Sequence, residues 1–250
     1  MTDSDPNYIV HDFGELLEYA AEKKPALTPS QGLIPLKHVR AMMDGFLVKE
    51  PHEHVWGDSI FKKRDEMEYE RFYFLDLLAV GGEFLKITGR NTLVKGPGWK
   101  IFFTVRPDER GFLMFHSFRY NFSMDGWLSK DADFGEQLEE KSASIWQKML
   151  PWCNGETIEW QPWAEELLLS CDLRWNSPDQ SFAKDLAVSS LDHCLIKPLE
   201  YFGLVITDRS EGKFSRLKSV RLNSAGCVYF RRLMTKSGQF VTALPPFSFN

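Results

Sequence analysis

The sequence predicts a mainly α-helical α+β protein with small β hairpins, built from two winged-helix-like units in tandem. Two observations indicate this class. Apolar residues recur at the three- and four-residue spacing of amphipathic helices over several segments. Two further segments, 83–102 and 204–223, place hydrophobic runs on either side of a polar turn, and each follows an apolar helix that ends in glycine. The order helix, short strand, helix, helix, hairpin therefore occurs in the first half and returns loosely in the second.

The composition predicts a folded protein of one large domain or of two domains of ordinary size. It has 250 residues, of which 43% are hydrophobic, enough to bury a sizeable core. The formal net charge of -5 excludes a protein that covers nucleic acid or anionic membrane with its whole surface, although it allows a local basic face. No apolar run approaches the roughly 18 residues of a membrane-spanning helix, so we expect no membrane partner.

The N-terminal stretch and the cysteines favour a reducing compartment. MTDSDPNYIVHDFGELLEY is acidic and lacks the basic-then-apolar order of a secretory signal, so we expect a cytoplasmic protein. The four cysteines form no C-x-x-C pair, so neither a zinc ribbon nor disulfides are expected.

The first predicted unit covers residues 1–125. Its helices are expected at 12–24, at 35–47 after the extended stretch ALTPSQGLIP, and at 65–80, where either Gly81 or Gly82 ends the helix in the left-handed conformation. Gly89-Arg90-Asn91 is expected to form the bend of the hairpin that follows. Residues 48–63, VKEPHEHVWGDSIFKK, are predicted to be an inserted loop rich in aromatic and charged residues.

The second predicted unit covers residues 126–250. Helices are expected at 135–152 and 162–173, and a third at 179–203, either continuous or broken near Pro198 and ended by left-handed Gly203. A hairpin with its tip at residues 210–212 precedes a closing helix at 224–234. The apolar, proline-broken tail 239–250 is expected to pack on the body or on a partner.

Two stretches carry a family resemblance. LTPSQGLIPLKHVRAMMD and VRLNSAGCVYFRRL resemble parts of uncharacterised bacterial winged-helix proteins associated with plasmids and insertion elements, in which an LT-x-x-G segment after the second hairpin strand starts the last helix. Residues 222–226 take that place here. The resemblance covers about residues 25–105 and 185–235. It implies the helix-turn-helix type of fold but no settled activity, and the insert at 48–63 departs from a compact winged helix.

No motif in the sequence predicts catalysis or a cofactor. His52 and His54 start a metal-site pattern, but two imidazoles are not a site, and Asp58 or His38 would have to complete it. The glycine pairs lack the spacing of a phosphate-binding loop, and Ser190, Asp192 and His193 fan around a helix axis instead of lining up as a relay. We therefore expect a protein that is not an enzyme and needs neither cofactor nor metal.

Charge is the more informative pattern. Residues 131–172 hold ten acidic and two basic side chains, whereas residues 206–236 hold eight basic and two acidic ones. A basic hairpin in an acidic protein is typical of a surface that contacts the phosphates of DNA. The predicted nucleic-acid-binding residues lie on this hairpin and are Arg209, Lys213, Arg216, Lys218 and Arg221.

Two functions stay open at this point. The acidic residues at 65–70 would meet phosphates if the third helix entered a DNA groove, so groove reading by the first unit is not expected. The second unit is expected to bind nucleic acid through its hairpin. The alternative is a protein-docking or structural module that self-associates or binds a partner, in which the basic residues pair with acidic helices through Glu136, Glu139 or Glu165.

Overall fold

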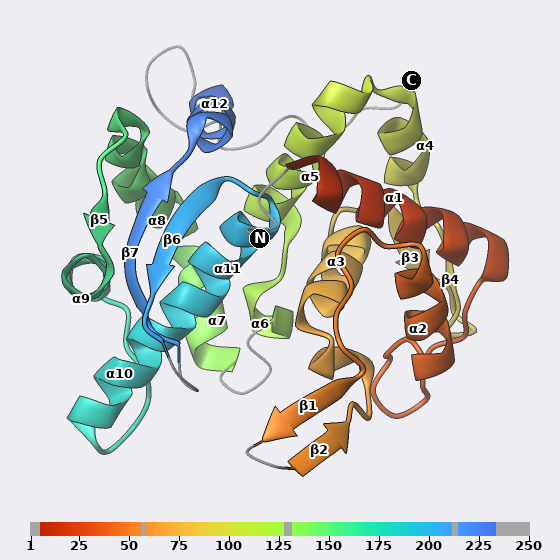
Figure 1. Ribbon diagram of the computed structural model, residues 1–250, viewed down its shortest axis with the longest axis horizontal. Coiled ribbons are helices and arrows are strands. Elements are labelled where there is room, and N and C mark those ends of the chain that lie inside the picture. The colour runs from red at the N-terminus through yellow and green to blue at the C-terminus, as the bar shows by residue number, and fades with distance from the viewer. Residues whose placement is uncertain (1–5, 57–58, 128–131, 212–214, 234–250) are drawn as a thin grey trace. The chain divides into compact units, whose positions relative to one another are not determined.

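The computed structural model describes residues 6–56, 59–127, 132–211 and 215–233 (Figure 1). In this part of the chain helices predominate, and the strands form three small antiparallel sheets. The prediction of a mainly α protein with small β hairpins is therefore confirmed. The chain divides into two compact units, Asp3–Phe122 and Ser123–Asn250, each with its own buried apolar side chains.

The first unit is organised around its N-terminal helix. Its helices are α1 (Pro6–Lys23), α2 (Leu36–Asp44), α3 (Glu70–Gly81), α4 (Pro97–Thr104) and α5 (Pro107–Asn121). One face of α1 is fully buried and includes Phe13, whose ring meets those of Phe84 and Phe102 edge to face at centroid distances of 5.2 and 5.3 Å. Helix α5 was not predicted from the sequence. It begins with a proline in its first turn and carries Asp108 and Glu109 there, where the helix dipole favours acids.

The first unit contains two hairpins instead of one. Strands β3 (Leu85–Ile87) and β4 (Leu93–Lys95) form the predicted hairpin, and Ala26 bridges to Thr92 beside β4. Strands β1 (Glu53–Trp56) and β2 (Ser59–Lys62) form a second hairpin inside the insert, so the prediction of a loop at 48–63 is wrong there. Valine, isoleucine and phenylalanine in this segment have high strand propensity, which outweighs its many charges.

The two glycine-ended helices end differently. Gly203 has φ 64°, so the predicted left-handed residue is confirmed at the point where the chain turns into the next strand. The matching prediction for Gly81 or Gly82 is wrong, because Gly82 has φ -81° and the left-handed residue is Glu83 at φ 57°. Gly82 serves close packing instead, since a Cβ there would lie 2.2 Å from Ser117 Oγ of α5.

The second unit contains more and shorter helices. They are α6 (Met124–Trp127), α7 (Ala132–Glu140), α8 (Ser142–Met149), α9 (Trp160–Ser170), α10 (Gln180–Leu191), α11 (Lys197–Tyr201) and α12 (Ser224–Arg232). A π-helical turn, Asp192–Ile196, joins α10 to α11, so the chain stays helical up to and past Pro198. Proline cannot donate a helical hydrogen bond, and the wider π turn accommodates this missing donor.

A three-stranded antiparallel sheet closes the second unit. Its order is β5 (Ile158–Glu159), β7 (Leu217–Leu222), β6 (Val205–Arg209), with β7 in the middle (Figure 1). Pairing of Val205 with Leu222 and of Thr207 with Val220 sets the register and buries one face of the sheet. The tip glycine of the predicted hairpin and the tail 239–250 lie outside the described residues.

Candidate nucleic-acid interface

Three of the five predicted basic residues lie exposed on the β6–β7 hairpin. Arg216 directly precedes β7, and Lys218 and Arg221 lie on it. Arg221 is paired across the sheet with Ile206, which is also exposed, so it projects from the face opposite the core. Lys213 lies outside the described residues. Within the described parts of the chain, no carboxylate forms an ion pair with Arg216, Lys218 or Arg221.

Arg209, the fourth predicted contact in the described chain, is held inside an intramolecular network. Its guanidinium donates to both carboxylate oxygens of Asp192 at 2.8 and 2.9 Å and to both of Glu200 at 3.0 Å. The three side chains are only 18, 16 and 22% exposed, respectively. Burial alone would lower the pKa of Arg209, but the hydrogen bonds and charges of the two carboxylates raise it above its ordinary value.

This network changes the interpretation of Arg209. Because its donors are directed at two carboxylates, Arg209 links β6 to the π turn and α11 instead of facing solvent with the other basic residues. Asp192 and Glu200 were not predicted as its partners, and two of the acidic residues that were predicted, Glu139 and Glu165, make other contacts. Glu139 accepts from the backbone of Met124, for example.

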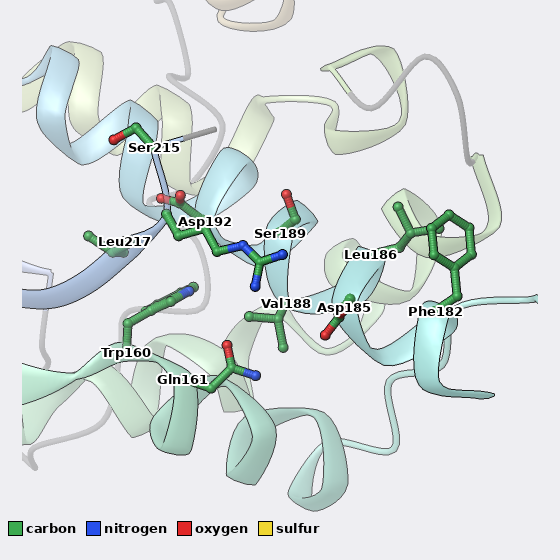
Figure 2. Close-up of a pocket in the computed structure, with 11 residues that line it drawn as sticks. Trp160, Gln161, Phe182, Asp185, Leu186, Val188, Ser189, Asp192, Ser215 and Leu217 are labelled. Atoms are coloured by element: carbon green, nitrogen blue, oxygen red, sulfur yellow. The ribbon is translucent and has the colours of Figure 1, made fainter. Parts of the chain in front are cut away.

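A pocket of about 420 Å³ lies between α9, α10 and the start of β7 (Figure 2). Trp160 and Leu217 lie at one end of it, and Phe182 and Leu186 at the other (Figure 2). The remaining lining residues are mostly polar: Gln161, Asp185, Val188, Ser189, Asp192, Ser215 and Arg216. One of the exposed basic residues of the hairpin therefore borders a partly apolar hollow.

Helix α10 is held beside this pocket by its N-cap and by an ion pair with α9. Its N-cap Asp179 accepts from the backbone N–H groups of Ser181 and Phe182 at 3.0 and 3.1 Å, which fixes the first turn. Lys184 pairs with Glu165 of α9 at 2.7 Å, and this hydrogen bond lowers the pKa of Glu165 below its ordinary value. The pairing that the docking hypothesis assigned to the hairpin is thus made by a residue of α10.

The acidic segment of the first unit does not occupy the start of a groove-entering helix. Helix α3 begins at Glu70, and Glu66 lies in a separate 3-10 turn, Glu66–Glu68, where it is fully buried and accepts from the backbone of Ile34. Burial raises the pKa of Glu66 well above its ordinary value and that of neighbouring Asp76 to about 6. The expectation that these acids would repel a phosphate backbone was therefore wrong for Glu66.

The other sequence candidates are separated or otherwise engaged. His52 Nδ1 lies 3.1 Å from the hydroxyl of Tyr69, whereas His54 Nε2 lies 3.3 Å from Glu68. Of the triad-like residues, His193 stacks on Trp127 at 4.6 Å and Asp192 pairs with Arg209. Among the described residues, no group of three or more histidines, cysteines or carboxylates is placed to hold a metal ion.

Comparison with known proteins adds no family to this description. No family model matches the chain, and neither a curated protein nor a solved structure matches it. No helix in the described part of the chain is both long and apolar enough to cross a membrane.

Proposed function

We propose that the chain is a non-enzymatic protein of two winged-helix-like units that binds nucleic acid through the β6–β7 hairpin of the second unit. The observation that carries the proposal is the presence of three exposed cations, Arg216, Lys218 and Arg221, on one hairpin without intramolecular carboxylate partners among the described residues. Exposed cations of this kind release counterions from a phosphate backbone, which is the main source of affinity in such complexes.

Strand order supports the winged-helix part of the proposal. In the second unit β5, the strand before α9, pairs with β7, and β7 pairs with β6, so the three strands lie in the order first, third, second across the sheet. In the first unit Ala26, which precedes α2, bridges to Thr92 beside β4, and β4 pairs with β3. A similar order therefore occurs in both units, with helices before each hairpin, although a single bridged residue takes the place of the first strand in the first unit.

Salt dependence tests the proposal most directly. Three phosphate contacts predict that the logarithm of the association constant falls with the logarithm of salt concentration with a slope of about -2.7 on duplex DNA. Fluorescence anisotropy with a labelled duplex at several salt concentrations measures this slope. Each of Arg216→Ala, Lys218→Ala and Arg221→Ala should lower its magnitude by about one.

The matched control is Arg40→Ala, which removes an exposed arginine on α2 of the first unit. It should leave the salt slope unchanged. Absence of binding at low salt, or an equal loss of affinity for the duplex in the Arg40 variant and in the hairpin variants, would contradict the proposal.

A second candidate function is protein docking through the β1–β2 hairpin. Val55, Ile60 and Phe61 are 73, 64 and 55% exposed on this hairpin, and two isolated strands stabilise each other poorly in water. Analytical ultracentrifugation of the wild type and of Ile60→Asp tests self-association. A wild type that sediments as a monomer at all concentrations would exclude self-association through this hairpin.

A further inference from the structure

The pocket beside the basic hairpin has two kinds of lining at once. Trp160, only 2% exposed, contributes to its apolar part and is stacked on Trp163 with ring centroids 5.6 Å apart. Gln161, Asp185 and Ser189 place an amide, a carboxylate and a hydroxyl around the same space (Figure 2). A ligand that fits this lining has a flat apolar ring with hydrogen-bonding groups on its edge.

Phe182 is the aromatic residue most available to such a ligand. It lies in the first turn of α10 and is 56% exposed, although a side chain of this size is normally buried in a folded unit. The hydrogen bond from its own backbone N–H to Asp179 fixes the turn that carries it. An exposed ring on a fixed turn at the edge of a pocket is suited to stacking against a planar group.

Arg216 adds a charge requirement to the pocket. Its backbone N–H donates to Ser210 Oγ at 2.8 Å, and its carbonyl accepts from the Ser210 N–H at 2.8 Å, so its position across the hairpin is fixed. Its guanidinium is exposed, and no carboxylate in the described chain pairs with it. Of the two carboxylates in the pocket lining, Asp192 is already paired with Arg209, and Asp185 lies on α10, so Arg216 favours a ligand that carries an anionic group close to its ring.

A nucleotide combines a flat ring, a hydrogen-bonding edge and a phosphate. The volume of about 420 Å³ is within the range of small-molecule pockets. The pocket therefore has room for one nucleotide but not for a base pair that is stacked between its neighbours in a duplex. In a duplex both faces of each base are covered by its neighbours, and only an unpaired base exposes a face to an aromatic side chain.

We propose that this pocket binds one unpaired nucleotide of a nucleic-acid strand, with the base against Phe182 and its phosphate on Arg216. The inference rests on the proposed function and makes it more specific, because it assigns single-stranded or locally unpaired nucleic acid as the preferred ligand. Gln161, Ser189 and Asp185 line the space that the edge of the base occupies. Lys218 and Arg221 lie outside the pocket lining and contact neighbouring phosphates in either kind of strand.

Two substitutions of exposed residues test the pocket without entering the core. Phe182→Ala removes the stacking ring, and Ser189→Trp fills the space. The matched control is Ser181→Trp, an identical change at an exposed position of α10 that does not line the pocket. The probes are a labelled 12-nucleotide single strand and the duplex formed with its complement, titrated by fluorescence anisotropy at low salt, with thermal unfolding measured for each variant.

The expected result is a loss of about 5- to 100-fold in affinity for the single strand in Phe182→Ala and Ser189→Trp. In both variants the affinity for the duplex and the midpoint of thermal unfolding should stay unchanged. The Ser181→Trp control should keep its affinity for the single strand. Single-strand affinity that is unchanged in both variants overturns the inference while leaving the proposed function standing. An equal loss of affinity for the single strand and for the duplex also overturns it, because the pocket then does not distinguish an unpaired nucleotide from a base pair. Binding of deoxycytidine monophosphate by calorimetry without binding of the strand also overturns it, because the pocket then serves a free small molecule. If neither strand nor duplex binds the wild type, the proposed function itself fails.

Discussion

The substitution Arg209→Met separates the structural arginine of the hairpin from those proposed to bind nucleic acid. Methionine keeps much of the apolar stem and removes the charge and all donors of the guanidinium. In the structure this removes four hydrogen bonds of 2.8–3.0 Å and leaves Asp192 without its cation, while Glu200 keeps Lys197, whose Nζ lies 3.8 Å away. We therefore expect the second unit to be strongly destabilised.

The magnitude follows from the burial of the network. Removing one partner of a buried ion pair costs about 3–5 kcal/mol, mainly because the remaining charge is left uncompensated. About a fifth of each of the three side chains is exposed, so water screens part of the uncompensated charge. We therefore expect a loss of about 3 kcal/mol in the free energy of unfolding. For a unit of this size the loss lowers the midpoint of thermal unfolding by about 10 °C.

Circular dichroism melts and urea titrations of the wild type and of Arg209→Met measure this loss. Arg221→Met is the control, because Arg221 is exposed on the neighbouring strand and its loss should leave stability within about 0.5 kcal/mol. In the background Asp192→Asn with Glu200→Gln, Arg209→Met should cost much less, since no buried negative charge remains. Unchanged stability together with a smaller salt slope for DNA would refute the structural role of Arg209.

Two further predictions concern single positions. Asp76→Asn should flatten the pH dependence of the first unit's free energy of unfolding. Burial raises the pKa of Asp76 to about 6, so the folded state retains a proton that the unfolded state releases. The stability of the wild type therefore falls by about 2–3 kcal/mol as the pH rises from about 4 to above 6. Urea unfolding at pH 4.5 and 7.5 checks this, and an equal change in unfolding free energy between the two pH values in wild type and variant would contradict it. Gly203→Val should destabilise the second unit by about 1–2 kcal/mol, because a β-branched residue is strained at φ 64°, whereas Gly89→Val, where a Cβ meets open space, should change thermal unfolding little. Equal shifts for the two valines would contradict the role of Gly203.

Local signals in the sequence predicted much of the fold. The apolar stripe of α1, the hairpin at 204–223 and the left-handed glycine before it depend on residues close together in the chain, so spacing and glycine chemistry suffice. Helix α5 buries the small residues Gly111 and Ser117 on its packed face, while the apolar Phe112 and Leu113 lie partly exposed beside it, so its sequence shows no simple amphipathic pattern. The β1–β2 hairpin was missed because its charges indicated a loop, although strand pairing depends on the backbone.

The polar interior was not predictable because its partners are far apart in sequence. Asp12 is fully buried and binds Arg71, 59 residues away, at 2.7 Å, while also accepting from the backbone of Leu47 at 2.6 Å. A sequence pattern records the charge of each residue but not whether it lies inside or outside. The same limit explains why Arg209 was grouped with Arg216 among the candidate contacts, although only Arg216 is exposed.

The network around Arg209 also bears on how the hairpin would bind. It joins β6 to the π turn that follows α10, and Asp192 of this turn lines the pocket, so the exposed cations of β7 keep a fixed position relative to α10 before any ligand arrives. A preorganised surface loses less conformational entropy on binding, so loosening the hairpin should weaken affinity without removing a phosphate contact. Arg209→Met is therefore expected to lower affinity while leaving the salt slope at its wild-type value, whereas Lys218→Ala lowers both. Anisotropy titrations over a salt series, at a temperature where both variants are folded, distinguish the two effects. A salt slope reduced by about one in Arg209→Met would place Arg209 on the phosphate backbone and contradict its role as a positioning residue.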